Sequence, residues 1–361
     1  MIKYLKAVVI NITTNIYKKK RFWAGVLLAQ FLLFYGFSKS IIMISFFKRF
    51  FEFQKELHQV LFSWVPFSVG DLIYIVLGAF LLYCFITLFK KQQRSDSMRK
   101  ILIVMNIFYF IYQIFWGMLY FQVPIIKKLS SQNEPDIEKA KKLALVYLEK
   151  CKATRQYTQE DSNGVFIITN LTSIQKEILN QQTKLPSYIS DKKAPEILDI
   201  KPSLFKNVMS FTGILGYYNP FTAEAQYNTE LPHTLIPFTT AHESSHQLGF
   251  AREQEANFIG YLIGIHSGNP ELRYSTEFFT LKSLLRFIVE KDPEFVKNIL
   301  HQYSPAMKRD RAYEKSFIFQ HQGWLDEFFG FTNNLFLKSN QQEGSVTYSY
   351  FIDLLLSYEK T

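Results

Sequence analysis

Residues 241–257 read AHESSHQLGFAREQEAN and place two histidines four positions apart. On a helix, positions i and i+4 share one face, so the imidazoles of His242 and His246 can reach one metal ion. Glu243 is offset from that face by one position and can hold a water molecule beside the ion. This HExxH arrangement is typical of zinc peptidases, where the histidines bind zinc and the glutamate acts as the general base. We therefore expect Zn²⁺ as the cofactor.

A catalytic zinc site requires a third protein ligand, and the sequence offers two carboxylates for this role. Gly249 is expected to end the first helix, because glycine readily adopts the left-handed conformation that closes a helix. A second helix then begins near Ala251 and carries Glu253 and Glu255. Two positions on a helix correspond to a rotation of about 200°, so only one of the two can face the metal. The spacing does not decide between them.

Three long apolar stretches precede this region and must position it. Each is long enough to supply the ~20 residues of helix that a bilayer core requires. We predict transmembrane helices at about 22–47, 69–89 and 101–126, within a membrane domain of residues 1–130. Residues 131–361 then form an extracytoplasmic domain. The segment FKRFFEFQKELHQVLFSW, between the first two spans, is predicted to be an amphipathic helix on the membrane surface.

Charge is distributed very unevenly along the chain. Residues 1–130 contain 17 Lys/Arg and 4 Asp/Glu, whereas residues 131–361 contain 24 and 27. The positive charge therefore flanks the apolar stretches, which is typical of membrane orientation and argues against a nucleic-acid partner. The first 21 residues and the segment 90–100 are the most basic, so both are expected to face the cytoplasm. The N-terminus is then cytoplasmic, and the chain after about residue 127 lies outside.

The second domain is predicted to be mainly α (α+β), with helices at 136–155 and from 237 onward. Residues 208–228 are rich in aromatic and β-branched side chains and predict a pair of short strands. The part from Thr222 to Asn228 is expected to lie beside the cleft and to hold an extended peptide by strand addition. Two further side chains are considered for substrate contacts. Glu224 either binds a substrate amine or caps a turn, and Tyr274 is a candidate for stabilising an oxyanion.

The HExxH followed by E-x-E-A-N resembles the gluzincin zinc peptidases, in which the first Glu of an E-x-x-A-[DN] stretch binds zinc. Carried over by position, this resemblance implies Glu253 as the third ligand, with Glu255 as the alternative, and Asn257 as a residue that supports the ligands. The sequence is also similar to the metzincin motif HExxHxxGxxH. Arg252 stands where that motif has its third histidine, so the metzincin assignment is excluded.

The whole chain resembles a bacterial multi-pass membrane family known as domain of unknown function 3810. The resemblance rests on PFSVGD, GYYNPFTAEAQYN, HESSHQLGFAREQEANF and YSTEF. It implies an α-helical protein of the bacterial cytoplasmic membrane, with three N-terminal transmembrane helices and a zincin-like domain.

These patterns together predict a membrane-anchored zinc metalloendopeptidase that hydrolyses a peptide or protein substrate at the extracytoplasmic face. The alternative is a non-catalytic membrane sensor or a peptide-binding pseudo-peptidase. In a third interpretation, the HExxH segment is simply a solvated polar helix. Neither the substrate nor the oligomeric state has a signature in the sequence.

Overall fold

The computed structural model describes residues 16–129, 136–323, 327, 330 and 347–359. It divides into two compact units. Unit 1 comprises the described residues up to Phe51 together with Val69–Gln122, and unit 2 comprises Glu52–Ser68 and the described residues from Val123 onward. The boundary therefore lies before the predicted residue 130, and an early segment of the chain, 52–68, belongs to the second unit.

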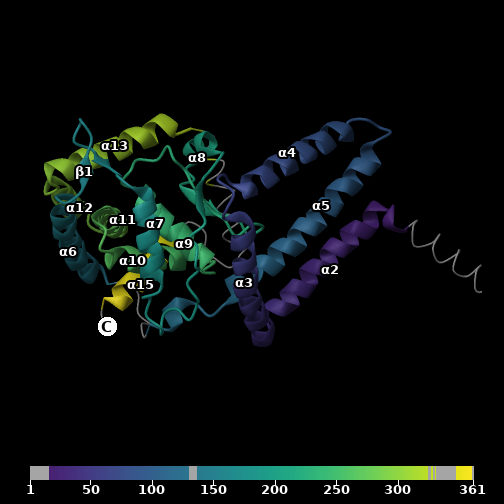
Figure 1. Cartoon of the computed structure of the whole chain (residues 1–361), viewed down its shortest axis with the longest axis horizontal. Coiled ribbons are helices and arrows are strands. Elements are labelled where there is room, and N and C mark those ends of the chain that lie inside the picture. The colour runs from purple at the N-terminus through teal and green to yellow at the C-terminus, as the bar shows by residue number, and fades with distance from the viewer. Residues whose placement is uncertain (1–15, 130–135, 324–326, 328–329, 331–346, 360–361) are drawn as a thin grey trace, which may run out of the picture. The chain divides into compact units, whose positions relative to one another are not determined.

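Unit 1 contains three helices that are long and apolar enough to cross a membrane, α2 (Lys20–Ser38), α4 (Val69–Leu88) and α5 (Arg94–Phe115). Helix α5 packs against both α2 and α4 (Figure 1). The buried side-chain amide of Asn106 on α5 donates to the carbonyl of Trp23 on α2 at 3.0 Å. The chain is therefore mostly helical, with three candidate membrane-spanning helices near its N-terminus.

Two of the predicted spans have different bounds in the structure. The first, 22–47, is divided between α2 and a separate helix, α3 (Ile41–Phe62). The break falls at the polar pair Lys39–Ser40, where the Ser40 hydroxyl accepts from the backbone N–H of Met43 at 3.4 Å. The third span is α5, which is followed by the short 3₁₀ helices η1 (Gly117–Phe121) and η2 (Ile125–Lys127).

The segment after Phe51 is held by hydrogen bonds within unit 2. Lys201 donates to the carbonyl of Phe62, the last residue of α3, at 2.8 Å. Gln226 donates to the hydroxyl of Ser68 at 2.8 Å. The predicted amphipathic surface helix is thus the C-terminal half of α3, and protein contacts help to hold it.

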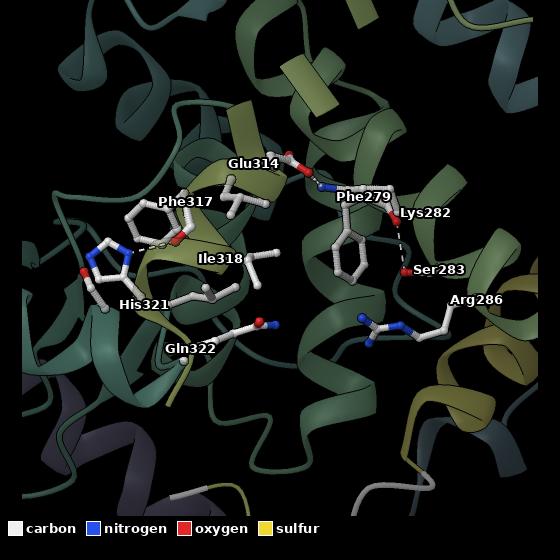
Figure 2. Close-up of a pocket in the computed structure, with 13 residues that line it drawn as sticks. Phe279, Lys282, Ser283, Arg286, Glu314, Phe317, Ile318, His321 and Gln322 are labelled. Atoms are coloured by element: carbon white, nitrogen blue, oxygen red, sulfur yellow. Dashed lines mark hydrogen bonds and ion pairs between the residues drawn. The ribbon is translucent and has the colours of Figure 1, made fainter. Parts of the chain in front are cut away.

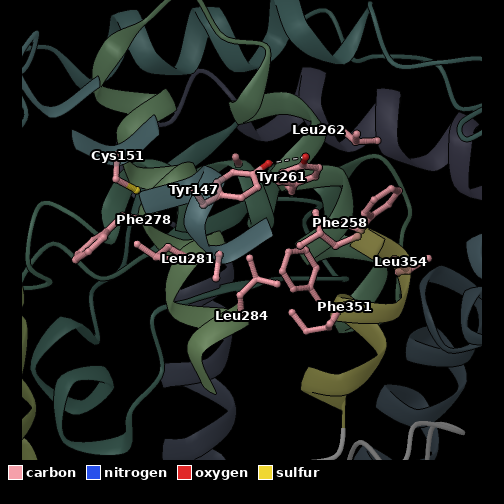
Figure 3. Close-up of a cluster of buried hydrophobic side chains, with 14 of the residues drawn as sticks. Tyr147, Cys151, Phe258, Tyr261, Leu262, Phe278, Leu281, Leu284, Phe351 and Leu354 are labelled. Atoms are coloured by element: carbon pink, nitrogen blue, oxygen red, sulfur yellow. Dashed lines mark hydrogen bonds between the residues drawn. The ribbon is translucent and has the colours of Figure 1, made fainter. Parts of the chain in front are cut away.

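The core of unit 2 is built around the long helix α11 (Pro270–Val289), which packs against α6 (Ile137–Arg155), α10 (Glu253–Ile265) and α12 (Pro293–His301). Figure 3 shows buried side chains from α6, α10, α11 and α15 (Thr347–Tyr358) meeting in one apolar cluster. Its only drawn hydrogen bond joins the hydroxyls of Tyr147 and Tyr261 at 2.7 Å. Unit 2 also contains helices α7 (Leu171–Gln182) and α13 (Pro305–His321).

Two small sheets accompany these helices. Strands β1 (Gln159–Glu160) and β2 (Phe166–Ile167) form an antiparallel pair. The second sheet has the order β3-β5-β4. Its strands are β3 (Ile200–Pro202), β4 (Gly216–Tyr218) and β5 (Ala225–Tyr227), with β3 parallel and β4 antiparallel to β5.

The predicted pair of strands in 208–228 is confirmed for β4 and β5 only. The beginning of that region forms helix α8 (Lys206–Thr212) instead. Gly213, with a φ of 69°, closes this helix in the left-handed conformation. The strand preference of its Val208 and Phe211 is overridden, because strand propensity depends strongly on tertiary context.

Candidate metal centre

The two histidines lie on helix α9 (Ile236–Gln247), which begins with Pro237 in its first turn as predicted. Every residue of α9 except His242 is buried. The hydroxyls of Thr240, Ser244 and Ser245 donate to backbone carbonyls of this helix, as Thr240 does to the Ile236 carbonyl at 2.8 Å. The interpretation of HExxH as a solvated helix face is therefore wrong. Burying polar side chains costs free energy unless they are hydrogen-bonded or paired, so polar residues on a buried helix indicate a specific structural or functional role.

The turn after α9 brings a backbone acceptor to the second histidine. Gly249 has a φ of 91°, in the left-handed region that favours glycine, and ends the helix as predicted. The chain then reverses so that the carbonyl oxygen of Phe250 lies 2.7 Å from Nδ1 of His246. Helix α10 begins at Glu253 directly after this turn.

His242, His246 and Glu253 form a group whose potential ligand atoms all lie within 4.8 Å of one another. The Nε2 atoms of the histidines are 3.2 and 3.6 Å from the two carboxylate oxygens of Glu253. Nδ1 of His242 lies 2.8 Å from Oδ1 of Asn257, and Nδ1 of His246 lies 2.7 Å from the carbonyl oxygen of Phe250. Both rings thus direct Nε2 toward Glu253, with oxygen acceptors behind them. Histidines that bind zinc are usually oriented in this way.

Glu255 faces away from this cluster. One of its carboxylate oxygens accepts from the backbone N–H of Ile125 at 2.8 Å and from the Arg252 guanidinium at 3.2 Å. Helix spacing leaves the choice between Glu253 and Glu255 open, and the resemblance to the gluzincins implies Glu253. The structure places Glu253 beside the two histidines, whereas Glu255 is hydrogen-bonded to Ile125 in η2.

The charges in the cluster complement one another. Burial alone would lower the pKa of His246, but the adjacent Glu253 carboxylate outweighs it and raises that pKa. Burial would raise the pKa of Glu253, but the two histidines hold it well below its usual range. A bound cation would replace the proton shared by these groups, so metal affinity should increase as the pH rises.

Glu243 lies beside the cluster and is only 4% exposed. Among the described residues, its Oε2 has no hydrogen-bond partner. Burial raises the pKa of Glu243 to about 7, although the nearby histidines oppose this shift. A carboxyl group with a pKa near neutrality is suited to accept and return a proton.

Gly216 on β4 is a site residue that the sequence analysis does not identify. A Cβ placed on it would lie 2.7 Å from Oε1 of Glu243 and 2.8 Å from the carbonyl oxygen of Gln226. Glycine within a strand often marks such a close approach. The sequence shows a glycine within a predicted strand, but it does not show which atoms lie close to that glycine.

We predict that Gly216→Ala destabilises unit 2, because the added methyl group must displace Glu243 or the β5 backbone. Overpacking of this kind costs about 1–3 kcal/mol of unfolding free energy. Thermal or denaturant unfolding of the detergent-solubilised full chain measures the change. Gly268→Ala is the control, because its nearest atom would be 3.9 Å away. Equal stability of the two variants would contradict the close approach.

Two residues predicted to contact the substrate are engaged elsewhere. Glu224 is fully buried and accepts from the Lys201 ammonium at 2.7 Å, so the amine that it binds belongs to the chain itself. Tyr274 is fully buried on α11, and its hydroxyl donates to Asp310 at 2.7 Å. Tyr274 is therefore part of the core, which corrects its predicted oxyanion role.

The predicted strand addition at Thr222–Asn228 also requires correction. That segment contains β5, the central strand, which is paired on one side with β3 and on the other with β4. The edge strand next to Glu243 is β4. At the two ends of the β4–β5 ladder, the backbone N–H of Asn228 donates to Leu215 and that of Asn219 donates to Glu224. Hydrogen-bonded and non-hydrogen-bonded pairs alternate along an antiparallel ladder, so Gly216 and Tyr227 form a non-hydrogen-bonded pair. The backbone N–H and C=O of Gly216 therefore point away from β5.

A family model described as "Protein of unknown function (DUF3810)" matches residues 46–356, and the chain therefore belongs to this family. The match includes the whole candidate metal centre and confirms the family resemblance. No curated protein and no solved structure matches the chain.

Proposed function

We propose that this chain is a membrane-anchored zinc metalloendopeptidase that hydrolyses peptide bonds at the extracytoplasmic face of the bacterial cytoplasmic membrane. One observation carries the proposal. The Nε2 atoms of His242 and His246 and the carboxylate of Glu253 converge beside Glu243, a buried carboxyl group with no described hydrogen-bond partner at Oε2.

The set of ligand atoms favours zinc over the common alternatives. Two imidazoles and one carboxylate form a known ligand set of catalytic zinc, which leaves a fourth position open. Calcium and magnesium prefer ligand sets made entirely of oxygen. When bound, zinc would polarise the substrate carbonyl and lower the pKa of water to about 7.

The protein's own groups account for the proton transfers. Glu243 accepts a proton from the attacking water as the new carbon–oxygen bond forms. It then gives that proton to the amine nitrogen as the carbon–nitrogen bond breaks. The outward-facing peptide groups of Gly216 can align an extended substrate along β4, next to Glu243.

We expect Glu253→Gln to weaken zinc binding by more than about 100-fold, since even residues behind the ligands contribute 10–100-fold. Elemental analysis and competition with a chromogenic chelator would measure zinc in the purified full chain. Glu255→Gln is the matched control. It makes the same change two residues away, at a carboxylate that faces Ile125 and Arg252, and should retain zinc.

Equal zinc binding by the two variants would contradict the ligand assignment. If the wild-type protein binds one zinc ion but cleaves no member of a peptide library, the alternative of a non-catalytic sensor or pseudo-peptidase gains support instead.

The proposed orientation is tested separately by reporter fusions. Alkaline phosphatase, which is active only outside the cytoplasm, should be active when fused after residue 129 and inactive when fused after residue 92. The reason is the high Lys/Arg content of the N-terminal segment and of the segment 90–100. The opposite pattern of activities would reverse the orientation.

A further inference from the structure

The second half of α3, after Phe51, turns an apolar face outward. Side chains at positions i, i+4, i+7 and i+8 share one face of a helix. This spacing and high exposure are found for Phe53, Leu57, Val60 and Leu61. The opposite face is polar and buried, and it contains Gln54, Lys55 and Gln59. The Lys55 ammonium donates to the carbonyl of Lys193 at 3.1 Å. A surface helix in water has the reverse arrangement, with its apolar side against the protein.

Helix α8 also places apolar side chains outside and polar ones inside. Val208 and Phe211, about one turn apart, are exposed, whereas Ser210 and Thr212 are buried. The Ser210 hydroxyl accepts from the Asn228 amide at 2.9 Å, so the polar side of α8 is bonded to the protein. The apolar side chains of this short helix are therefore left at the surface.

Contacts within unit 2 hold both faces in place. The ring centroids of Phe211 and His321 are 4.9 Å apart. Figure 2 shows His321 beside Phe317, whose carbonyl oxygen lies 2.8 Å from its Nδ1. Lys201 on β3 donates to the carbonyl of Phe62 at the end of α3, and α8 begins four residues after β3 ends. Both apolar faces therefore adjoin β3.

The position of residues 52–68 in the chain identifies a lipid bilayer as the partner of this surface. Val69 begins the candidate span α4 directly after Ser68. No linker separates the two, so this segment ends at the bilayer surface when α4 crosses the bilayer. Trp64 is 77% exposed, and tryptophan is enriched at membrane–water interfaces. Exposed apolar patches mark sites of protein or membrane contact, and the adjoining span favours the membrane.

We propose that the apolar faces of α3 and α8 form one lipid-contacting surface of unit 2. Strand β4 begins at Gly216, four residues after α8 ends at Thr212, which is at most about 14 Å along the chain. Gly216 lies against Glu243, so the edge of β4 opens beside this surface. The inference rests on the proposed function and specifies its substrate class, which is segments of membrane-bound proteins that lie next to the bilayer.

The first test locates the surface without any catalysis. The full chain is placed in lipid nanodiscs, and one fluorophore is attached to Val208→Cys, Leu57→Cys or Tyr157→Cys. The native Cys84 and Cys151 are buried. Tyr157 is the control, because it is exposed but lies outside the proposed surface, after α6. Doxyl groups on the lipid chains quench fluorophores in the bilayer, and iodide quenches those in water.

We expect doxyl lipids to quench the fluorophores at positions 208 and 57 at least about threefold more strongly than the one at 157, since interfacial helices enter the bilayer by about 5–10 Å. Iodide should show the reverse order. Adding Phe211→Glu should reduce doxyl quenching at position 208 to the level at 157. Tyr313→Glu is the matched control, because Tyr313 is an aromatic residue of similar exposure on α13, and it should change nothing. Circular dichroism confirms that each variant is folded.

Two results would overturn the surface. Iodide quenching at position 208 as strong as at 157 would place the face of α8 in water. Quenching at position 208 by neither agent would mean that protein, such as a second copy of the chain, covers that face.

The second test addresses the substrate class. A peptide that the protein cleaves is compared in two forms, anchored to the nanodisc by a palmitoyl chain and free in solution. Phe211→Glu should slow cleavage of the anchored form by at least about tenfold and leave cleavage of the free form unchanged, since association with lipid raises the local concentration of an anchored substrate only for an enzyme seated at the same surface. Equal effects on the two forms would overturn the substrate class.

The outcomes separate this inference from the proposed function. If no peptide is cleaved but the quenching pattern is as expected, the proposed peptidase fails and the lipid-contacting surface stands. If peptides are cleaved while position 208 is in water, the surface is overturned and the peptidase remains.

Discussion

Glu243→Gln is expected to retain bound zinc and to lose peptidase turnover by roughly 10²–10⁴-fold, the usual contribution of a general base. Glutamine has nearly the same shape as glutamate but cannot accept the proton of the attacking water. Glu243 is not one of the three converging ligand residues, so its replacement should leave the metal cluster intact. Loss of turnover with retention of zinc is therefore the specific signature of this role.

The measurement pairs elemental analysis with cleavage of a fluorogenic peptide library by the full chain in detergent. Glu255→Gln serves as the control, because it makes the same change at another buried carboxylate, outside the cluster, and should preserve both properties. Cleavage by Glu243→Gln at the wild-type rate would contradict the proposed role of Glu243 as the general base. Loss of zinc from Glu243→Gln would instead show that this residue holds the metal site together.

The residues of the cluster could be predicted because the relevant distances are local. Helical periodicity alone places His242 and His246 on one face, and the helix after Gly249 returns a carboxylate to them. The choice of Glu253 over Glu255 could not be predicted from helix spacing, and only the resemblance to the gluzincins favours Glu253. The choice depends on the backbone N–H of Ile125, which is 130 residues away and binds Glu255.

The wrong prediction of strand addition at Thr222–Asn228 also arises from contacts between residues that are far apart in the sequence. The sequence indicates strands near β4 and β5, but β3 is only three residues long and includes Pro202, so it gives little strand signal. Without β3, one edge of β5 would be unpaired. With β3 in place, β5 is central, and Glu224, which immediately precedes β5, is buried against Lys201.

Hydropathy located the three candidate membrane-spanning helices but not all their ends. Apolar residues lie on both sides of Lys39–Ser40, so composition alone joins two helices that the structure separates. Whether a segment such as 52–68 packs on a distant part of the chain depends on tertiary contacts, which a linear scan cannot detect.

Tyr274 shows that a polar residue near a motif need not belong to the functional site. Replacement of its hydrogen-bond partner, Asp310, is expected to have the largest effect on stability. Asp310 on α13 is fully buried. It accepts from Tyr274 at 2.7 Å, from the backbone N–H of Phe166 at 2.8 Å, and from Arg155 at 2.8 and 3.3 Å. One carboxylate thereby joins α6, β2, α11 and α13.

Asp310→Ala is expected to lower the free energy of unfolding by about 3–5 kcal/mol, because it leaves the buried Arg155 guanidinium without its principal counter-charge. Glu160→Gln is the matched control. Glu160 also pairs with Arg155, at 3.3 Å, but is 46% exposed, and such surface pairs contribute only about 0–1 kcal/mol. Denaturant unfolding of the full chain in detergent would measure both. Similar losses in the two variants would mean that the charge on Arg155 is compensated by the exposed carboxylate, and that Asp310 does not organise this part of the core.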